Sequence, residues 1–232
     1  MPSFQELPDE MKRRLLDHLC GFITAGRCKR FEELILFRTR YMTIVLEDIY
    51  QSHNASAVLR SCDCFGIQDV HIIENHNRYQ VNPDVALGAS KWLSLSRYNN
   101  GEHNTADCID QLKEKGYSVY CTTPHENDFT PESLPLEQKF ALVFGTELQG
   151  LSPVAMEKAD GFVRIPMVGF TESLNISVSA AIFMHRLSWR IRGSTYNWKL
   201  SEEEKTSILL SWVAATVKRS DLIINDFIRH NP

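Results

Sequence analysis

Two segments of the sequence could present backbone groups to a small ligand, because each places glycine in a loop between a strand-like run and a helix-like run. The first is residues 144–153, FGTELQGLSP, with Glu147 inside the loop. The second is residues 165–181, where Gly169 precedes a helical pattern that begins near Ser173 and is rich in small side chains. Both also have a structural interpretation: a solvated loop acid in the first, and a capped, tightly packed helix in the second.

A third segment, residues 53–66, places an arginine six positions after an asparagine. In a structural interpretation, Asn54 caps a helix over residues 54–65, Gly66 ends that helix, and Arg60 is a surface arginine. In a functional interpretation, Arg60 binds an anionic substrate, because a guanidinium stays charged in proteins and grips phosphate through parallel hydrogen bonds. The segment alone leaves both open.

The elements that must position these segments alternate between strand and helix. Short apolar runs at 43–46, 70–73, 118–121, 140–144 and 162–165 read as strands, and residues 54–65, 104–115, 152–158 and 173–192 read as the intervening helices. Runs that are apolar on both faces indicate a parallel sheet covered by helices, so we predict the α/β class. No glycine follows the first run, which excludes a G-x-G-x-x-G cofactor loop there.

Both ends of the chain favour helical extensions. Met11, Leu15 and Leu19 recur at helical spacing near the start, and Ser201 with Glu204 has the spacing of a capping box. An apolar stripe over residues 208–227 follows and must pack on the body or on a partner chain. We therefore predict an N-terminal helical extension at 1–40, a central α/β domain at 41–192 and a C-terminal helical extension at 193–232.

The composition fits a globular protein of 232 residues, 43% hydrophobic and 23% charged. The N-terminus has no apolar signal core and no window is apolar enough to span a membrane, so a cytoplasmic location is expected. The six cysteines show no zinc-type spacing; we expect free thiols and no metal. The net charge of −4 is unevenly spread: 9 Lys/Arg against 18 Asp/Glu over residues 41–185, but net positive ends.

In this order and with these gaps, the three segments resemble the motif set of the TrmH/SpoU family of SPOUT RNA methyltransferases. Residues 54–60 are similar to its first motif, residues 145–147 to its second and residues 173–175 to its third. Residues 88–92 resemble a weaker family segment. The resemblance covers roughly residues 41–192 and is carried by motif positions that all match.

The resemblance implies a Rossmann-like, mostly parallel sheet whose C-terminal stretch is threaded into a deep trefoil knot, with helical extensions at both ends. It also implies S-adenosylmethionine as the cofactor, held by loops of the knot largely through backbone groups. The adenine and ribose pocket would then be lined by Thr122, Gly145, Ile165, Met167 and Leu174.

The implied reaction is attack of a ribose 2'-hydroxyl on the methyl group of a sulfonium, in which alignment of the reacting atoms is the main demand. Arg60 is expected to grip the phosphate and ribose of the substrate and to stabilise the forming alkoxide, because a guanidinium is too basic to act readily as a base. Asn54, Glu147, Ser173 and Asn175 would orient Arg60 and the ribose, or help shape a site borne by a dimer.

The expected partners are tRNA and a second copy of the chain. The helical extensions resemble those of the tRNA-modifying branch, which implies guanosine 18 of the D-loop as the target. Basic residues near the ends would compensate for the acidic middle on RNA: Arg27, Lys29, Arg30, Arg38, Arg40, Lys218 and Arg219. The alternatives are ribosomal RNA or another tRNA position, and a non-catalytic RNA-binding protein on the same scaffold.

Overall fold

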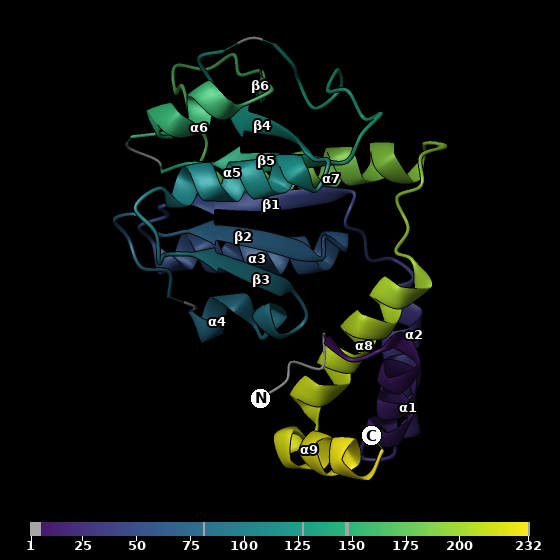
Figure 1. The fold of residues 1–232 in the computed structure, drawn as a ribbon. Coiled ribbons are helices and arrows are strands. Elements are labelled where there is room, and N and C mark those ends of the chain that lie inside the picture. The colour runs from purple at the N-terminus through teal and green to yellow at the C-terminus, as the bar shows by residue number, and fades with distance from the viewer. Residues whose placement is uncertain (1–5, 81, 127, 147–148, 232) are drawn as a thin grey trace. The chain divides into compact units, whose positions relative to one another are not determined.

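The computed structural model describes residues 6–80, 82–126, 128–146 and 149–231, and it divides into two compact units (Figure 1). The helical unit joins both ends of the chain, Met1–Arg38 and Lys199–Pro232, and the sheet unit is Thr39–Trp198. The two ends of the sheet unit meet, because the Thr39 hydroxyl donates to the carbonyl oxygen of Trp198 at 2.6 Å.

The sheet unit is built on six strands in the order β3-β2-β1-β5-β4-β6, and every strand pairing is parallel. The expected parallel α/β sheet is thereby confirmed. The strands are β1 (Met42–Glu47), β2 (Asp69–Ile73), β3 (Ser94–Tyr98), β4 (Ser118–Thr122), β5 (Phe140–Phe144) and β6 (Gly161–Val163). The helices are α3 (Ser52–Phe65), α4 (Pro83–Ala86), α5 (Asn104–Glu114), α6 (Pro153–Lys158) and α7 (Ile176–Arg192), with a 3-10 turn at Ala89–Lys91.

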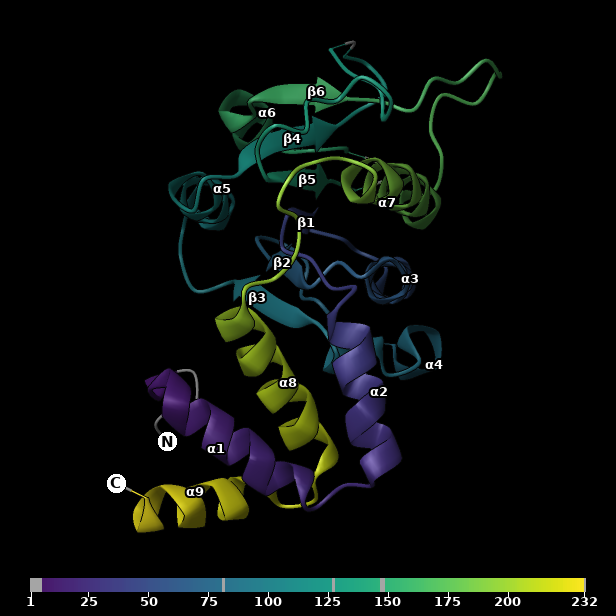
Figure 2. The same ribbon diagram turned by 90° about the vertical axis from the view of Figure 1, so that its right-hand side faces the viewer.

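Helices cover both faces of this sheet, and the strands are apolar on both sides for that reason. Figure 2 shows α3 and α7 on one side and α5 and α6 on the other. Successive strand residues point to opposite faces. On β1, Ile44 and Leu46 join the core under α3 and α7, whereas Val45 joins the core under α5 and α6.

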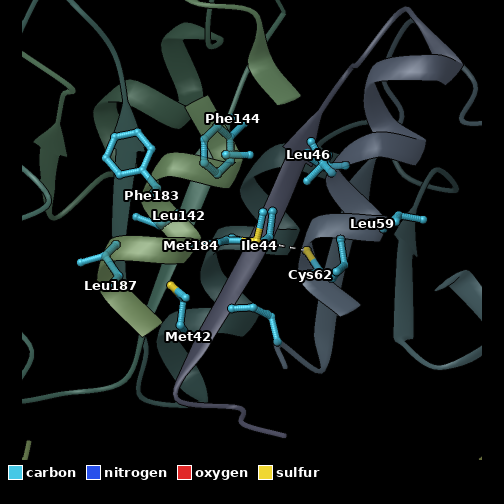
Figure 3. Close-up of a cluster of buried hydrophobic side chains, with 14 of the residues drawn as sticks. Met42, Ile44, Leu46, Leu59, Cys62, Leu142, Phe144, Phe183, Met184 and Leu187 are labelled. Atoms are coloured by element: carbon cyan, nitrogen blue, oxygen red, sulfur yellow. Dashed lines mark hydrogen bonds between the residues drawn. The ribbon is translucent and has the colours of Figure 1, made fainter. Parts of the chain in front are cut away.

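The core under α3 and α7 holds the largest buried side chains near the candidate site. Figure 3 shows the β1 residues Met42, Ile44 and Leu46 among side chains of α3, β5 and α7. The Cys62 thiol of α3 lies 3.6 Å from the sulfur of Met184 of α7, so the two helices touch directly. This packing holds α3 and α7 together along the same face of the sheet.

The helical unit consists of α1 (Asp9–Cys20), α2 (Ala25–Ile35), α8 (Glu202–Thr216) and α9 (Ser220–His230). Ser201 and Glu204 form the predicted capping box at the start of α8. Trp212 of α8 is buried, with the Phe31 ring 5.7 Å away and the Arg38 guanidinium 5.0 Å from its ring centroid. Each half of this unit therefore buries its apolar face against the other half.

The structure departs from the predicted elements in several places. The edge strand β3 was not predicted, because its half-exposed residues form no apolar run. The helix predicted from Ser173 begins at Ile176, since Asn175 is its N-cap and accepts from the backbone N–H of Ser177 at 2.8 Å. The stripe over residues 208–227 is split between α8 and α9 near Arg219, whose φ is +54°.

Within the described residues, no helix is long and apolar enough to cross a membrane. All six cysteines are free thiols, as the sequence predicted.

The packing makes Leu112 of α5 a sensitive test of the fold. Leu112 is 1% exposed, and we expect Leu112→Ala to lower the free energy of unfolding by about 2–5 kcal/mol through lost burial and a cavity. Glu114→Ala, at an exposed position on the same helix, should change it by no more than about 0.5 kcal/mol. Chemical denaturation of the two variants makes the comparison, and equal effects would contradict the assignment of this face to the core.

Candidate functional site

A cavity of about 400 Å³ opens in the sheet unit at the carboxyl ends of β4, β5 and β6. All five residues predicted to hold the cofactor line it, and so does Ser173. The predicted lining residues are Thr122, Gly145, Ile165, Met167 and Leu174. Segments spread over residues 122–183 thus converge on one cavity, where an open parallel sheet usually binds its ligand.

The glycine loop after β5 closes tightly on itself. Thr146 and Gly150 exchange two backbone hydrogen bonds of 3.0 Å, and Gly150 has a φ of +67° that favours glycine. A Cβ atom at Gly145 would lie 2.3 Å from the carbonyl oxygen of Gly150, which is too close for any side chain. Glycine at position 145 therefore lets the loop present its backbone to the cavity.

A buried carboxylate anchors the end of this loop. Glu47, the last residue of β1, is 3% exposed and accepts the Ser152 backbone N–H at 2.9 Å and the Ser152 hydroxyl at 2.7 Å. The Thr105 hydroxyl of α5 donates to the same carboxylate at 2.7 Å. Ser152 in turn caps α6, accepting from the Ala155 N–H. Glu47 thus ties β1, α5 and the start of α6 together.

The first and third motifs meet through two amides. The Asn175 side-chain amide donates to the side-chain oxygen Oδ1 of Asn54 at 3.2 Å, and the Asn54 side-chain NH₂ donates to the Gln51 side-chain oxygen at 3.2 Å. The prediction that Asn54 caps α3 is wrong, since α3 begins at Ser52 and Asn54 lies buried in its first turn. Its amide instead bonds Asn175, the residue that caps α7.

Of the predicted catalytic residues that the structure describes, Ser173 lines the cavity, whereas Asn54, Arg60 and Asn175 do not. Arg60 is exposed on α3 and is not among the residues that line the cavity wall in the described part of the chain. Glu147 lies outside the described residues. Geometry within one chain therefore brings Asn54, Asn175 and Ser173 to the same end of α3 and α7, and it leaves Arg60 pointing to solvent.

The loop after β2 is fixed beside the end of β1. The Asp48 carboxylate accepts backbone N–H groups of Asn75, His76 and Asn77 at 2.7, 2.8 and 3.2 Å. Burial acts to raise the pKa of Asp48, but the hydrogen bonds outweigh it and hold this pKa below the usual 3.8. Since the folded-state pKa of Asp48 is depressed, its hydrogen bonds stabilise the fold at pH values above the usual 3.8. That stabilisation is lost as the pH falls through the depressed pKa.

The basic residues predicted to contact RNA fall into two groups. Five of them are exposed in the helical unit: Arg27, Lys29, Arg30, Lys218 and Arg219. The other two are engaged within the protein. Arg38 is buried over the Trp212 ring, and Arg40, in the sheet unit, pairs with Asp69 at 3.0 Å.

The cavity walls combine apolar side chains with hydrogen-bonding groups. Phe144, Ile165 and Leu174 offer apolar surface, and the Ser173 hydroxyl and the glycine-loop backbone offer polar groups. Arg164 also lines the cavity, and its buried Nε has no hydrogen-bond partner among the described residues. Such walls suit a ligand with a flat apolar ring and polar substituents. No three His, Cys, Asp or Glu side chains of the described residues gather as a metal site.

Sequence reasoning missed Glu47 and Arg164. Glu47 could have been recognised, since it is a carboxylate at the end of an otherwise apolar strand. A carboxylate buried there needs hydrogen-bond partners, which indicates a polar cluster around it. Arg164 gave no such signal, since the pattern of its segment does not distinguish a cavity wall from a solvent-facing position.

The SpoU rRNA Methylase family matches residues 41–185 of the chain. A relative named tRNA (guanosine(18)-2'-O)-methyltransferase from Borreliella burgdorferi is 42% identical over 219 residues, which is 94% of this chain and 98% of the relative. The crystal structure of the A. aeolicus TrmH/SpoU tRNA modifying enzyme superposes with a TM-score of 0.74 at 27% identity, covering 84% of this chain and 98% of that one.

A more distant structure shares the fold alone. The SpoU methyltransferase AviRb from Streptomyces viridochromogenes, solved in complex with the cofactor AdoMet, superposes with a TM-score of 0.58 at 22% identity. The superposition covers 69% of this chain and 65% of AviRb.

Glu47 allows a test of how the cavity is held in shape. In Glu47→Gln, the amide NH₂ would face one of the donors of Ser152 or Thr105, so we expect the free energy of unfolding to fall by about 1–3 kcal/mol. The control is Glu132→Gln, whose side chain is 56% exposed in an ion pair with Arg186 and should be nearly neutral. Denaturant unfolding compares the two variants; a Glu47→Gln protein as stable as the control would show that the tie is dispensable.

Proposed function

The chain belongs to the SpoU rRNA methylase family, and on that premise we propose that it transfers a methyl group from S-adenosylmethionine to a ribose 2'-hydroxyl of tRNA, at guanosine 18. The observation that carries the proposal is the convergence of Gly145 from the second motif and Ser173 from the third on one cavity. The relative from Borreliella burgdorferi, similar along nearly the whole chain, supports this substrate.

The cavity fits S-adenosylmethionine. The adenosine part would lie against Ile165, Met167 and Leu174, with Thr122 and the glycine loop at Gly145 around it. Arg164 brings a cation with an unsatisfied buried Nε, which suits the carboxylate of the methionine part. When bound, the cofactor supplies a methyl group on a positively charged sulfur. AviRb, which shares the fold, has been solved with AdoMet.

The residues of this chain would contribute positioning and charge. Arg60 would hold the phosphate beside the target ribose and stabilise negative charge on the 2'-oxygen as its proton leaves. Asn54 and Asn175, joined by their amide hydrogen bond, would fix the beginnings of α3 and α7 next to that ribose. Ser173 lies on the cavity wall, where its hydroxyl could hydrogen-bond the ribose.

We propose further that the protein works as a homodimer through α7 and the loop before it. Val168 and Phe170 are fully exposed in that loop, and Val178, Ile182 and Trp189 continue an exposed apolar stripe along α7. A groove of about 760 Å³ lies between α3 and α7 at this face. Exposed apolar side chains that gather on one face of a protein usually mark an interface. A second copy is the occupant we assign, because Arg60 lies outside its own cavity and would complete the cavity of a partner.

The contact with tRNA would fall on the exposed cations of the helical unit. Lys29 and Arg30 lie on α2, and Lys218 and Arg219 lie between α8 and α9. The sheet unit, which carries 13 Lys/Arg against 18 Asp/Glu, offers less attraction to phosphate. Phosphate contacts position a folded RNA without reading its sequence, which suits recognition of tRNA by shape.

Methylation of an unmodified tRNA transcript tests the proposed reaction. We expect transfer to that transcript and none when guanosine 18 is replaced, and we expect Arg60→Ala to lower the rate by about 100-fold or more. Cofactor affinity, measured by calorimetry, should be unchanged in Arg60→Ala. Equal methylation of both transcripts would refute the position, and transfer to ribosomal RNA fragments alone would refute the substrate.

Salt dependence tests the helical unit. Replacing Lys29 and Arg30 by alanine should weaken tRNA binding and reduce the slope of log affinity against log salt by about 1.4–1.8, at about 0.7–0.9 per lost phosphate contact. A matched control replaces Lys113 and Lys158, which pair with Asp160 and Asp110 in the sheet unit. An equal loss of slope in the control would mean that charge alone, and not the place of these cations, sets the affinity.

Mixed dimers test whether the site is shared. Arg60→Ala and Gly145→Ala should each be inactive alone, the second because an added Cβ collides with the loop at Gly150. If Arg60 serves the cavity of its partner, co-expression should restore about a quarter of wild-type activity, since half of the dimers are mixed and each holds one intact site. Activity that stays at the level of the single variants would place Arg60 and the cavity of one chain in the same site.

A further inference from the structure

The helical unit contains two cysteines whose sulfur atoms lie unusually close. The Sγ atoms of Cys20 and Cys28 are 3.0 Å apart, about 1 Å longer than a disulfide bond. Cys20 is the last residue of α1, and Cys28 lies in the second turn of α2. Figure 2 shows the short connection that joins these helices.

Neither cysteine of the pair is buried. Each cysteine is half-buried, whereas Cys62, Cys108 and Cys121 are buried in the sheet unit. A buried cysteine usually fills an apolar position in a core. These two thiols instead lie against each other. We propose that Cys20 and Cys28 are a reversible redox site that forms an intrachain disulfide on reaction with a peroxide.

The surroundings of the two thiols indicate which of them reacts with the peroxide first. Burial, then the hydrogen bond and charge of Cys28, raise the pKa of Cys20 to about 12. Cys20 also ends α1, where the helix dipole disfavours an anion. We assign the first attack to Cys28, which lies near the start of α2, although its thiol also donates a long hydrogen bond of 3.9 Å to the Glu32 carboxylate.

In the first step, the Cys28 thiolate attacks one oxygen of hydrogen peroxide, the O–O bond breaks, and the hydroxide released takes a proton to become water. Cys28 is then a neutral sulfenic acid, so its charge no longer opposes ionisation of Cys20. In the second step, the Cys20 sulfur attacks the Cys28 sulfur, the S–O bond breaks, and the leaving hydroxide takes the Cys20 proton. Two thiols are oxidised and one peroxide is reduced to two waters.

The disulfide would close the stretch from Cys20 to Cys28, which contains the Thr24 cap of α2. It would also fix the first turns of α2 to the end of α1. Lys29 and Arg30 follow Cys28 directly, so the site borders the cations for which tRNA contact is proposed. The redox chemistry itself does not depend on that proposal.

Peptide mapping of the full-length protein tests the site. The reduced protein is treated with hydrogen peroxide, alkylated while denatured, and digested with trypsin, which cleaves after Arg27 and so separates the two cysteines. We expect a cross-linked pair of peptides containing Cys20 and Cys28, a fall from six alkylatable thiols to four, and full reversal by dithiothreitol.

Three variants sharpen the result. In Cys20→Ser, Cys28 should persist as a sulfenic acid that dimedone traps; in Cys28→Ser, Cys20 should stay reduced at the same dose. Cys64→Ser removes the exposed cysteine of α3 and should leave the cross-link intact. The proposal is overturned if both thiols stay free, if Cys28 is overoxidised without a cross-link, or if Cys64 reacts first.

Discussion

The parallel pairing of all six strands is the constraint from which the rest of the structure follows. A parallel sheet needs a crossover between neighbouring strands and a cover on both faces, and here α3 and α7 cover one face while α5 and α6 cover the other. It also directs every strand toward the same edge. The loops that follow β4, β5 and β6 therefore meet there and supply the cavity wall, and Glu47 at the same end of β1 anchors it.

The sequence predicted the parts of this arrangement that depend on local pattern. The apolar runs of β1 and β5 are buried on both faces, so they could be recognised without knowing their neighbours. The edge strand β3 is half-exposed and could not. The start of α3 was misplaced for a related reason: Asn54 has the chemistry of a cap, but its partner is Asn175, 121 residues away, and no local pattern reveals such a contact.

Some residues of the candidate site could likewise be predicted from the sequence, and others could not. The cofactor residues followed from the family resemblance, and the structure places all five on one cavity. The family's knot and the part played by Glu147 stay predictions. The role of Arg60 could not be settled from one chain, because an arginine that completes a neighbour's cavity looks like any exposed arginine of its own helix. Arg38 shows the opposite case, since the charge distribution suggested an RNA contact and the fold buries it over Trp212.

The meeting of Thr39 and Trp198 has a consequence for how the protein is made. The sheet unit can close as soon as its last helix leaves the ribosome, because both of its ends are then present. The helices α1 and α2 emerge first but bury Leu15 and Phe31 in a unit that also needs α8. During synthesis they must wait for about 160 more residues, roughly 10–30 s, with apolar side chains exposed. These helices, translated before the sheet unit, are therefore completed after it, and a nascent chain that stalls before α8 would present them to chaperones.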